Sequence, residues 1–303
     1  MDVRTTHRGE RRGVAWVPVT RGAVRRADAA DSFSAELRAW ASRLPEGAAF
    51  THLTGAKAWG LWLPSVPVPL PVTVQVPGSA KPERPGLRVI RSEPVQPPVV
   101  HRGIPLVGVV DVLLTLCRDL ADLDALVAVD SALHLRLVDL SQLQEASRVR
   151  RRGAPRLRRV IRLADGRSES AWETVLREFH RLMGVAVTPQ FEVRTDDGGF
   201  VARGDLRLDG FAVLHEYDGH HHLEVERQRT DLRRQRRLVE AGWVRRGYTS
   251  SDLLGRASGV LRDIDLTLGR SHDPARVRSW HDQLRSSALT DSVRTALGRR
   301  LVR

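Results

Sequence analysis

The chain has 303 residues, of which 41% are hydrophobic, so it is long enough to bury a sizeable core in two domains. Its single cysteine, Cys117, excludes a disulfide framework and a zinc cluster built on cysteines. The excess of 49 lysines and arginines over 36 aspartates and glutamates gives a net charge of +13, which indicates a polyanionic partner, most commonly nucleic acid.

The basic residues also have a simpler explanation. Only Lys57 and Lys81 are lysines, and such an arginine bias with abundant alanine is typical of a GC-rich genome. Codon bias accounts for arginine in place of lysine. It does not account for the excess of basic over acidic residues, so nucleic-acid contact stays the favoured interpretation.

The sequence predicts neither export nor membrane insertion. Its most apolar segment, 103–117, contains Asp111 and is shorter than the roughly 20 residues that a membrane-spanning helix needs. The amino-terminal residues are too charged for a signal peptide. We therefore expect a soluble cytoplasmic protein with no membrane partner.

The first part of the chain, residues 1–147, predicts a small mixed α/β domain. Residues 64–100 are rich in proline and β-branched residues, which favours short strands and loops over helix. Apolar residues at helical spacing predict helices on both sides of this region. In chain order, the predicted elements are a strand at 14–24, helices at 33–44 and 51–62, and helices at 106–118, 120–135 and 137–146.

An arginine-rich linker is predicted at residues 148–167. Such a run is usually a solvated helix face or a hinge, whereas contact with phosphates is the more specific interpretation. The arginines expected to contact nucleic acid here are Arg151, Arg152, Arg158 and Arg159.

The clearest pattern of elements lies in a predicted domain at residues 168–270, which a basic helical tail at 271–303 follows. An amphipathic helix is predicted first, and Asp209-Gly210 is a strong signal for a two-residue hairpin turn. The predicted elements are a helix at 170–183, strands at 191–194, 200–207 and 211–218, a helix at 224–241, a strand at 243–249 and a helix at 251–268.

The densest group of titratable residues is the stretch 215–222, which reads HEYDGHHH. If residues 209–210 form a two-residue turn, Asp205 pairs with Leu214 across the hairpin. Positions two apart on a strand share a face, so Asp205 lies on the same sheet face as Glu216. The two carboxylates are then diagonal neighbours, roughly 7–8 Å apart at the backbone.

Carboxylates that converge in this way repel each other unless a cation or a shared proton lies between them. Asp205 and Glu216 therefore predict a site for Mg²⁺, or Mn²⁺, since Mg²⁺ prefers oxygen ligands and accepts water and phosphate in the rest of its shell. Asp218 projects from the same face. His222 lies just past the strand end, where it can serve as a general acid or base.

Each of these residues also has a structural interpretation. Glu173 follows Ser170 at the spacing of a capping box, which is as good an explanation as metal ligation. Asp218 with the next glycine is common turn chemistry, and adjacent histidines at 220–222 cannot all face one site. The basic helix face at 227–237 is either solvated or in contact with phosphates. Its arginines expected to contact nucleic acid are Arg227, Arg233, Arg234 and Arg237.

The order of these residues resembles a known family. Asp205, ten residues and then E-Y-D-G-x-x-H is similar to uncharacterised proteins related to the very-short-patch repair endonucleases, within the PD-(D/E)XK nuclease superfamily. The likeness covers roughly residues 168–255. It extends to Ser170-Ala-Trp-Glu173, Arg177, Pro189-Gln190, Asp231, Arg234, Leu238, Gly242 and Trp243.

The amino-terminal part resembles regions that precede this domain in many actinobacterial proteins. The likeness runs from 19–25 to 129–143, and some of those proteins are labelled AbiEi-like antitoxins. Many of them begin with a winged-helix segment, for which too few residues precede Thr20. The resemblance leaves the identity of any partner toxin open.

The resemblance implies a restriction-endonuclease-like core, a mixed sheet flanked by helices, that cleaves phosphodiesters with Mg²⁺. Asp205 matches the metal-binding aspartate and Glu216 the acidic residue of the E-x-K element. Glu173 matches a helix glutamate that some members use as an extra ligand, and His222 matches the histidine of the signature. Asp218 stands where the E-x-K element of the superfamily has lysine. The pattern of the resembled family generally has aspartate there too, but without the lysine the superfamily mechanism is incomplete.

Three functional hypotheses follow. The first is a DNA-cleaving, metal-dependent endonuclease in which Asp205 and Glu216 hold Mg²⁺, Asp218 adds a ligand or positions water, and His222 transfers a proton. The second keeps the fold as a catalytically degenerate DNA-binding or antitoxin-like regulator. The third is a protein-interaction module whose charge reflects codon bias. A further departure from the family is Gly247, where relatives often carry a basic residue.

Overall fold

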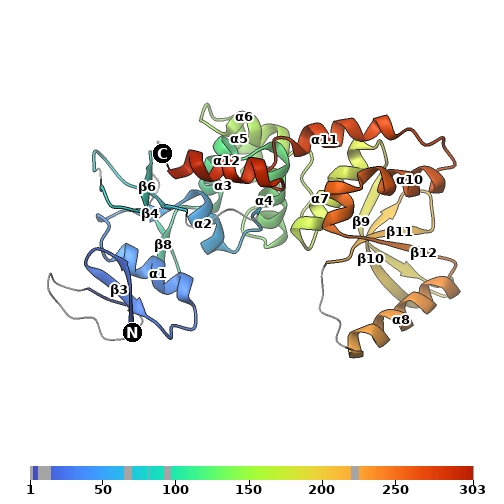
Figure 1. Cartoon of the computed structure of the whole chain (residues 1–303), viewed down its shortest axis with the longest axis horizontal. Helices are drawn as coiled ribbons and strands as arrows, with labels where there is room; N and C mark the ends of the chain where they lie inside the picture. Colours follow the sequence, from blue (N-terminus) through green and yellow to red (C-terminus); the bar gives the residue numbers. More distant parts are fainter. Residues whose placement is uncertain are drawn as a thin grey trace. The chain divides into compact units, whose positions relative to one another are not determined.

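The computed structural model of this chain divides into two compact units, and each combines helices with β-sheet (Figure 1). The predicted α/β class is therefore confirmed. The first unit comprises Met1–Leu120, Val138–Arg159 and Arg294–Arg303, and the second comprises Ala121–Leu137 and Val160–Val293. The structure describes residues 3–5, 15–64, 70–80, 82–91, 97–219 and 225–302, without the side chains of 225–229. Among these residues, no helix has both the length and the apolar character needed to cross a membrane.

The units differ from the predicted domain boundaries at residues 147, 167 and 270. The predicted linker 148–167 is divided after Arg159 and contains the helix α6 (Ala154–Val160). Leu157 of this helix is fully buried, whereas the arginines around it take the more exposed positions. The arginine run is therefore partly a packed helix and not an open hinge. The predicted tail 271–303 is likewise divided between the units.

The first unit contains two sheets. A three-stranded antiparallel sheet has the order β1-β3-β2, and a five-stranded mixed sheet has the order β6-β5-β4-β8-β7. Its core includes Trp40, Phe50, Val74 and Leu106. The strands are β1 (Val3–Thr5), β2 (Trp16–Thr20), β3 (Ala23–Arg26), β4 (Ala49–Phe50), β5 (Val72–Gln75), β6 (Leu87–Ile90), β7 (Val99–His101) and β8 (Ile104–Leu106). The helices are α1 (Ser32–Ala41), α2 (His52–Trp59), α3 (Val109–Asp119), α5 (Leu140–Arg148), α6 and most of α12 (Asp291–Val302).

The second unit is built on one four-stranded mixed sheet with the order β12-β11-β10-β9. Only the β11–β12 pair is parallel among its described strand pairs. The strands are β9 (Val187–Arg194), β10 (Phe200–Leu208), β11 (Val213–Tyr217) and β12 (Val244–Tyr248). The helices are α4 (Asp122–His134), α7 (Ala171–Leu182), α8 (Val225–Glu240), α9 (Ser250–Gly255), α10 (Ala257–Thr267), η1 (Pro274–Val277) and α11 (Arg278–Leu284).

Helices cover both faces of this sheet. Alternate residues of β11 point to opposite faces, so His215 and Leu214 have different neighbours. His215 contacts His180 of α7, whereas Leu214 packs in one cluster with Leu238 of α8. In Figure 1 the sheet lies between α8 on one side and α10 on the other.

The register of the central hairpin differs from the prediction by two residues. Leu214 pairs with Arg207 and not with Asp205. Residues 209–210 do form a turn, in which the amide of Phe211 donates to the carbonyl of Leu208 (3.1 Å), but β11 begins later, at Val213. Because a shift of two keeps each residue on its face, Asp205 stays on the face of Glu216. The shift makes the two residues direct neighbours across the strands.

Candidate active site

Asp205 is a half-buried carboxylate with a single hydrogen-bond donor among the described residues. One of its oxygens, Oδ2, accepts a hydrogen bond from the backbone amide of Tyr217 (2.8 Å). Among the described residues, no arginine or histidine forms an ion pair with it. Burial, followed by the negative charge of Glu173 and then that of Glu216, raises the pKa of Asp205 to about 7. Asp205 therefore exchanges a proton near neutral pH.

Glu216 has the opposite environment. It is 3% exposed, and Arg234 donates to both of its oxygens, to Oε2 at 2.8 Å. Arg245 Nε donates to Oε2 at 2.5 Å. Burial alone would raise the pKa of Glu216, but the hydrogen bonds and charges of the two arginines outweigh it and lower this pKa. Glu216 therefore stays ionised at pH values at which Asp205 begins to take up a proton.

Arg245 also explains the glycine at position 247. Its Nη2 donates to Asp218 Oδ1 (2.5 Å), so one guanidinium bridges Asp218 and Glu216. A Cβ atom added to Gly247 would lie 1.6 Å from Asp218 Oδ2, so a side chain there would require the Asp218 carboxylate to move from its present position. Arg245 lies two residues before Gly247 on the same face of β12, so its positive charge reaches both Glu216 and Asp218.

Glu173 lies in the first turn of α7, which Ser170 caps, and also acts electrostatically on Asp205. Its amide donates to Ser170 Oγ (3.2 Å), which is the N-cap interaction that the spacing predicts. Its Oε2 accepts from the amide of Glu169 (2.7 Å) and from Gln190 Nε2 (2.8 Å). The N-cap contact of Ser170 is therefore present, but the Glu173 side chain accepts from the amide of Glu169 and not from that of Ser170, as a capping box would require. The charge of Glu173 raises the pKa of Asp205.

Gln190 has an unusual backbone for a strand residue. Its φ is 52°, in the left-handed region that residues other than glycine rarely adopt. The pairs Gly204–Phe191 and Leu206–Pro189 on either side of it place Gln190 opposite Asp205. Such strain is concentrated at functional sites, so it marks this position as part of the candidate site.

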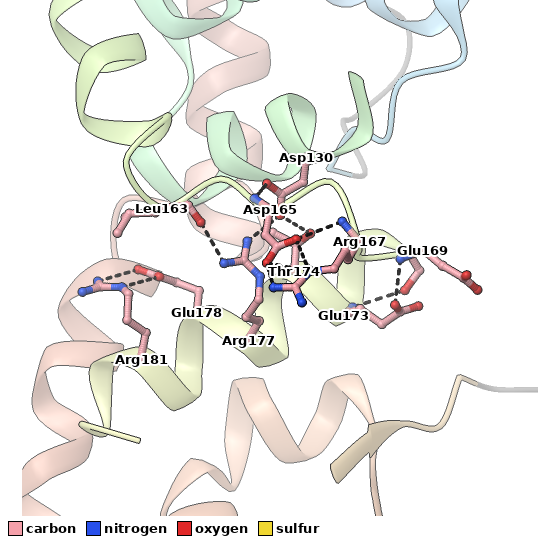
Figure 2. A network of polar contacts seen from close by, with 11 residues as sticks. Asp130, Leu163, Asp165, Arg167, Glu169, Glu173, Thr174, Arg177, Glu178 and Arg181 are labelled. Atoms are coloured by element: carbon pink, nitrogen blue, oxygen red, sulfur yellow. Dashed lines mark hydrogen bonds and ion pairs between the residues drawn. The ribbon is translucent and has the colours of Figure 1, made fainter. Parts of the chain in front are cut away.

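A buried polar network fixes α7, which carries Glu173 (Figure 2). Asp130 of α4 is 0% exposed and accepts from Thr174 Oγ1 (2.8 Å), Arg177 Nη2 (2.6 Å) and the amide of Asp165 (2.8 Å). Burial raises the pKa of Asp130 to about 6, although the charge of Arg177 and the hydrogen bonds favour its ionised form. The network holds the start of α7 at a fixed position beside the sheet.

His215 lies in the core and not in the site. The carbonyl of Leu176 only accepts, so His180 Nδ1 donates to it (2.8 Å) and His180 Nε2 accepts from His215 Nδ1 (2.9 Å). Both rings are 0% exposed. Burial lowers the pKa of His180 to about 4, and burial with the nearby charges lowers that of His215 to about 2, so both are neutral at pH 7.

The residues expected to contact nucleic acid do not form one group. In α8, Arg234 turns to Glu216, Arg237 donates to the carbonyl of Phe200 (2.7 Å), and Arg233 is exposed. In the first unit, Arg151 pairs with Asp111 (2.5 Å), and Arg158 and Arg159 each donate to a backbone carbonyl. Arg152 is exposed. The side chain of Arg227, and all of His222, lie outside the described residues.

The donor set fits a cation with few protein ligands. Within the described part of the chain, no group of three or more His, Cys, Asp or Glu residues could hold a metal ion. Mg²⁺ is commonly held by one or two carboxylates, with water and phosphate oxygens completing its shell. Asp205 is a half-buried carboxylate near the charges of Glu173 and Glu216, and it forms no ion pair among the described residues.

Comparison of the chain with known protein families, curated proteins and solved structures gives no match. The resemblance to the nucleases related to very-short-patch repair therefore stays an expectation from the motif residues. Function has to be inferred from the chemistry around Asp205.

Proposed function

We propose that the second unit cleaves nucleic-acid phosphodiesters, with DNA as the expected substrate, at the site around Asp205 with Mg²⁺ or Mn²⁺. One observation carries this proposal: Asp205 is half-buried beside Glu173 and Glu216, and no described residue forms an ion pair with it. A buried carboxylate in such surroundings is unfavourable unless a proton or a cation joins it. A mixed sheet flanked by helices, with α7 before it, supports the restriction-endonuclease-like core that the motif residues suggest.

The residues of the site would divide the work. The metal, when bound, would polarise the scissile phosphate and lower the pKa of a water molecule. Asp205 would hold it, and Glu216 would join after exchanging one guanidinium contact. The arginine whose contact is exchanged, Arg234 or Arg245, would then be available to neutralise a phosphate oxygen. Asp218 would orient water, and His222 remains a predicted proton donor.

A second function is favoured by the surroundings of Glu216. Both of its oxygens accept hydrogen bonds from arginines, so a metal must displace at least one of these contacts. Asp218, where the superfamily has lysine, pairs with Arg245. These contacts are what a unit that has lost catalysis would retain, and they support the alternative of a non-cleaving DNA-binding or antitoxin-like regulator.

A plasmid-nicking assay distinguishes the two functions. Supercoiled DNA is incubated with wild type, Asp205→Asn or Glu216→Gln in Mg²⁺, Mn²⁺ or EDTA. Metal-dependent nicking that both variants lose supports cleavage. The matched control is Asp196→Asn, an exposed loop aspartate without a described contact, which should nick like wild type. Salt-sensitive DNA binding without nicking in any metal supports the regulator.

A further inference from the structure

The first unit contains a surface hollow that the proposed cleavage site does not use. It has a volume of about 890 Å³ and is lined by residues from 117–119 and 148–159. Eight of its fourteen lining residues are arginines, whereas one, Asp119, is acidic. We refer to this feature as the arginine hollow.

Part of the arginine set holds the wall of the hollow together. Arg151 Nη1 forms an ion pair with Asp111 Oδ1 at 2.5 Å, and both side chains are largely buried. Arg158 Nη2 donates to the carbonyl of Ser147 (2.6 Å). These arginines are already bound within the unit, so they give the hollow its shape and are poorly placed to bind a partner.

The backbone of the wall is also tightly packed. Gly153 has a φ of 89°, and a Cβ atom added to it would lie 2.1 Å from the carbonyl oxygen of Leu114. Arg156 Nη1 donates to the carbonyl of Cys117, near the end of α3 (2.8 Å). The arginine segment is therefore fixed directly on α3, and the hollow is formed without a ligand.

A second group of arginines in the hollow has no acidic partner among the described residues. Arg148, Arg150 and Arg152 are exposed and form no ion pair or hydrogen bond among the described residues. The acid of the hollow, Asp119, is already paired with Arg88 (3.2 Å). Like charges gathered around one concave surface repel each other and raise the local potential, so an anion with several charges is the complementary ligand.

We propose that the arginine hollow binds consecutive phosphates of a nucleic-acid backbone. Guanidinium groups match phosphate oxygens with paired hydrogen bonds, and the hollow offers several within one surface. None of the lining residues is aromatic, so bases find no stacking partner and recognition is confined to the backbone. This inference does not depend on the proposed cleavage, because it concerns the other unit and requires no metal.

The test measures binding of a fluorescent DNA duplex of mixed sequence by the full chain, in EDTA, over a range of salt concentrations. One variant combines Arg148→Gln, Arg150→Gln and Arg152→Gln. The matched control combines Arg21→Gln, Arg43→Gln and Arg299→Gln, which removes the same charge from exposed arginines of the same unit outside the hollow. A third series adds ATP or pyrophosphate as competitor.

The hollow variant should bind DNA at least about tenfold more weakly, and its plot of log affinity against log salt should be less steep by about 3, one for each lost phosphate contact. The control should stay within about twofold of wild type. Equal losses in the hollow and control variants would show that net charge alone binds DNA and would overturn the proposal. Competition by ATP or pyrophosphate at concentrations well below those of DNA phosphate would also overturn it, since the hollow would then select a free oligophosphate.

Discussion

The acidic site of the second unit and the arginine hollow of the first use arginine in opposite ways. At the site, Arg234 and Arg245 are bound to carboxylates, and the charge in excess is the negative charge of Asp205. In the hollow, Arg148, Arg150 and Arg152 exceed the acids around them. The net charge of +13 is therefore unevenly distributed, and we propose that the acidic site binds a cation and the arginine hollow an anion.

The largest expected effect is the loss of the buried ion pair between Arg177 and Asp130. Arg177→Met should lower the free energy of unfolding by about 3–5 kcal/mol, because it leaves Asp130 buried without its cation. Denaturant unfolding measures this loss. The matched control is Arg167→Met, whose side chain is 58% exposed and should cost about 0–1 kcal/mol. Similar losses in both variants would contradict the account of the network in Figure 2.

The next largest effect is the pH dependence of folding stability that arises from Asp205. Its pKa is raised to about 7 in the folded state, so the folded protein binds this proton more tightly than the unfolded chain. Stability from this group is present at low pH and is lost as pH rises through about 7. Asp205→Asn should therefore be more stable than wild type at pH 8, by roughly 2–4 kcal/mol, and lose this advantage near pH 4.

Thermal or denaturant unfolding of Asp205→Asn at both pH values, without divalent metal, measures this difference. Asp196→Asn should show no such pH dependence, since this loop residue is exposed. An Asp205→Asn variant that is less stable than wild type at pH 8 would mean that the site already compensates this carboxylate.

The buried histidine pair predicts a smaller effect of opposite sign. The folded-state pKa values of His180 and His215, about 4 and about 2, lie below the ordinary value of 6.5. Their contribution is present above pH 6.5 and is lost as pH falls towards 4, because the unfolded chain then binds more protons. Replacing both with phenylalanine should reduce the loss of stability between pH 6.5 and 5 by roughly 1–3 kcal/mol relative to wild type. An unchanged acid slope would contradict the neutral pair.

The smallest effect is expected in the arginine hollow. The variant with Arg148→Gln, Arg150→Gln and Arg152→Gln should keep its free energy of unfolding within about 0.5 kcal/mol of wild type, because these side chains make no described contact. Chemical denaturation provides the measurement. A loss of several kcal/mol would show that these arginines stabilise the fold, which would contradict their assignment to ligand binding.

Local patterns in the second unit predicted most of its elements. The capping spacing of Ser170 and Glu173 predicted the start of α7, and strand alternation put Asp205 on the face of Glu216. The predicted helix 251–268 is instead two helices, α9 and α10, with the break at Arg256. Hydrophobic periodicity predicts neither the helix break at Arg256 nor the hairpin register. Both depend on the backbone conformation of the connecting residues.

Contacts between distant segments were not predictable. The role of Arg245 depends on β12 pairing in parallel with β11, which puts its guanidinium beside Glu216 and Asp218. The boundary between the units also depends on packing, since Leu157 is buried within a run that composition identifies as a basic linker. Such contacts have no local signature.

The central claim is that Asp205 lacks a cation which a divalent metal supplies. Thermal unfolding of wild type and Asp205→Asn at pH 8, with increasing Mg²⁺ or Mn²⁺, tests it directly, because a ligand that binds the folded state raises the unfolding temperature. Metal should stabilise wild type and leave Asp205→Asn unchanged. Equal stabilisation of both proteins, or of neither, would contradict the claim.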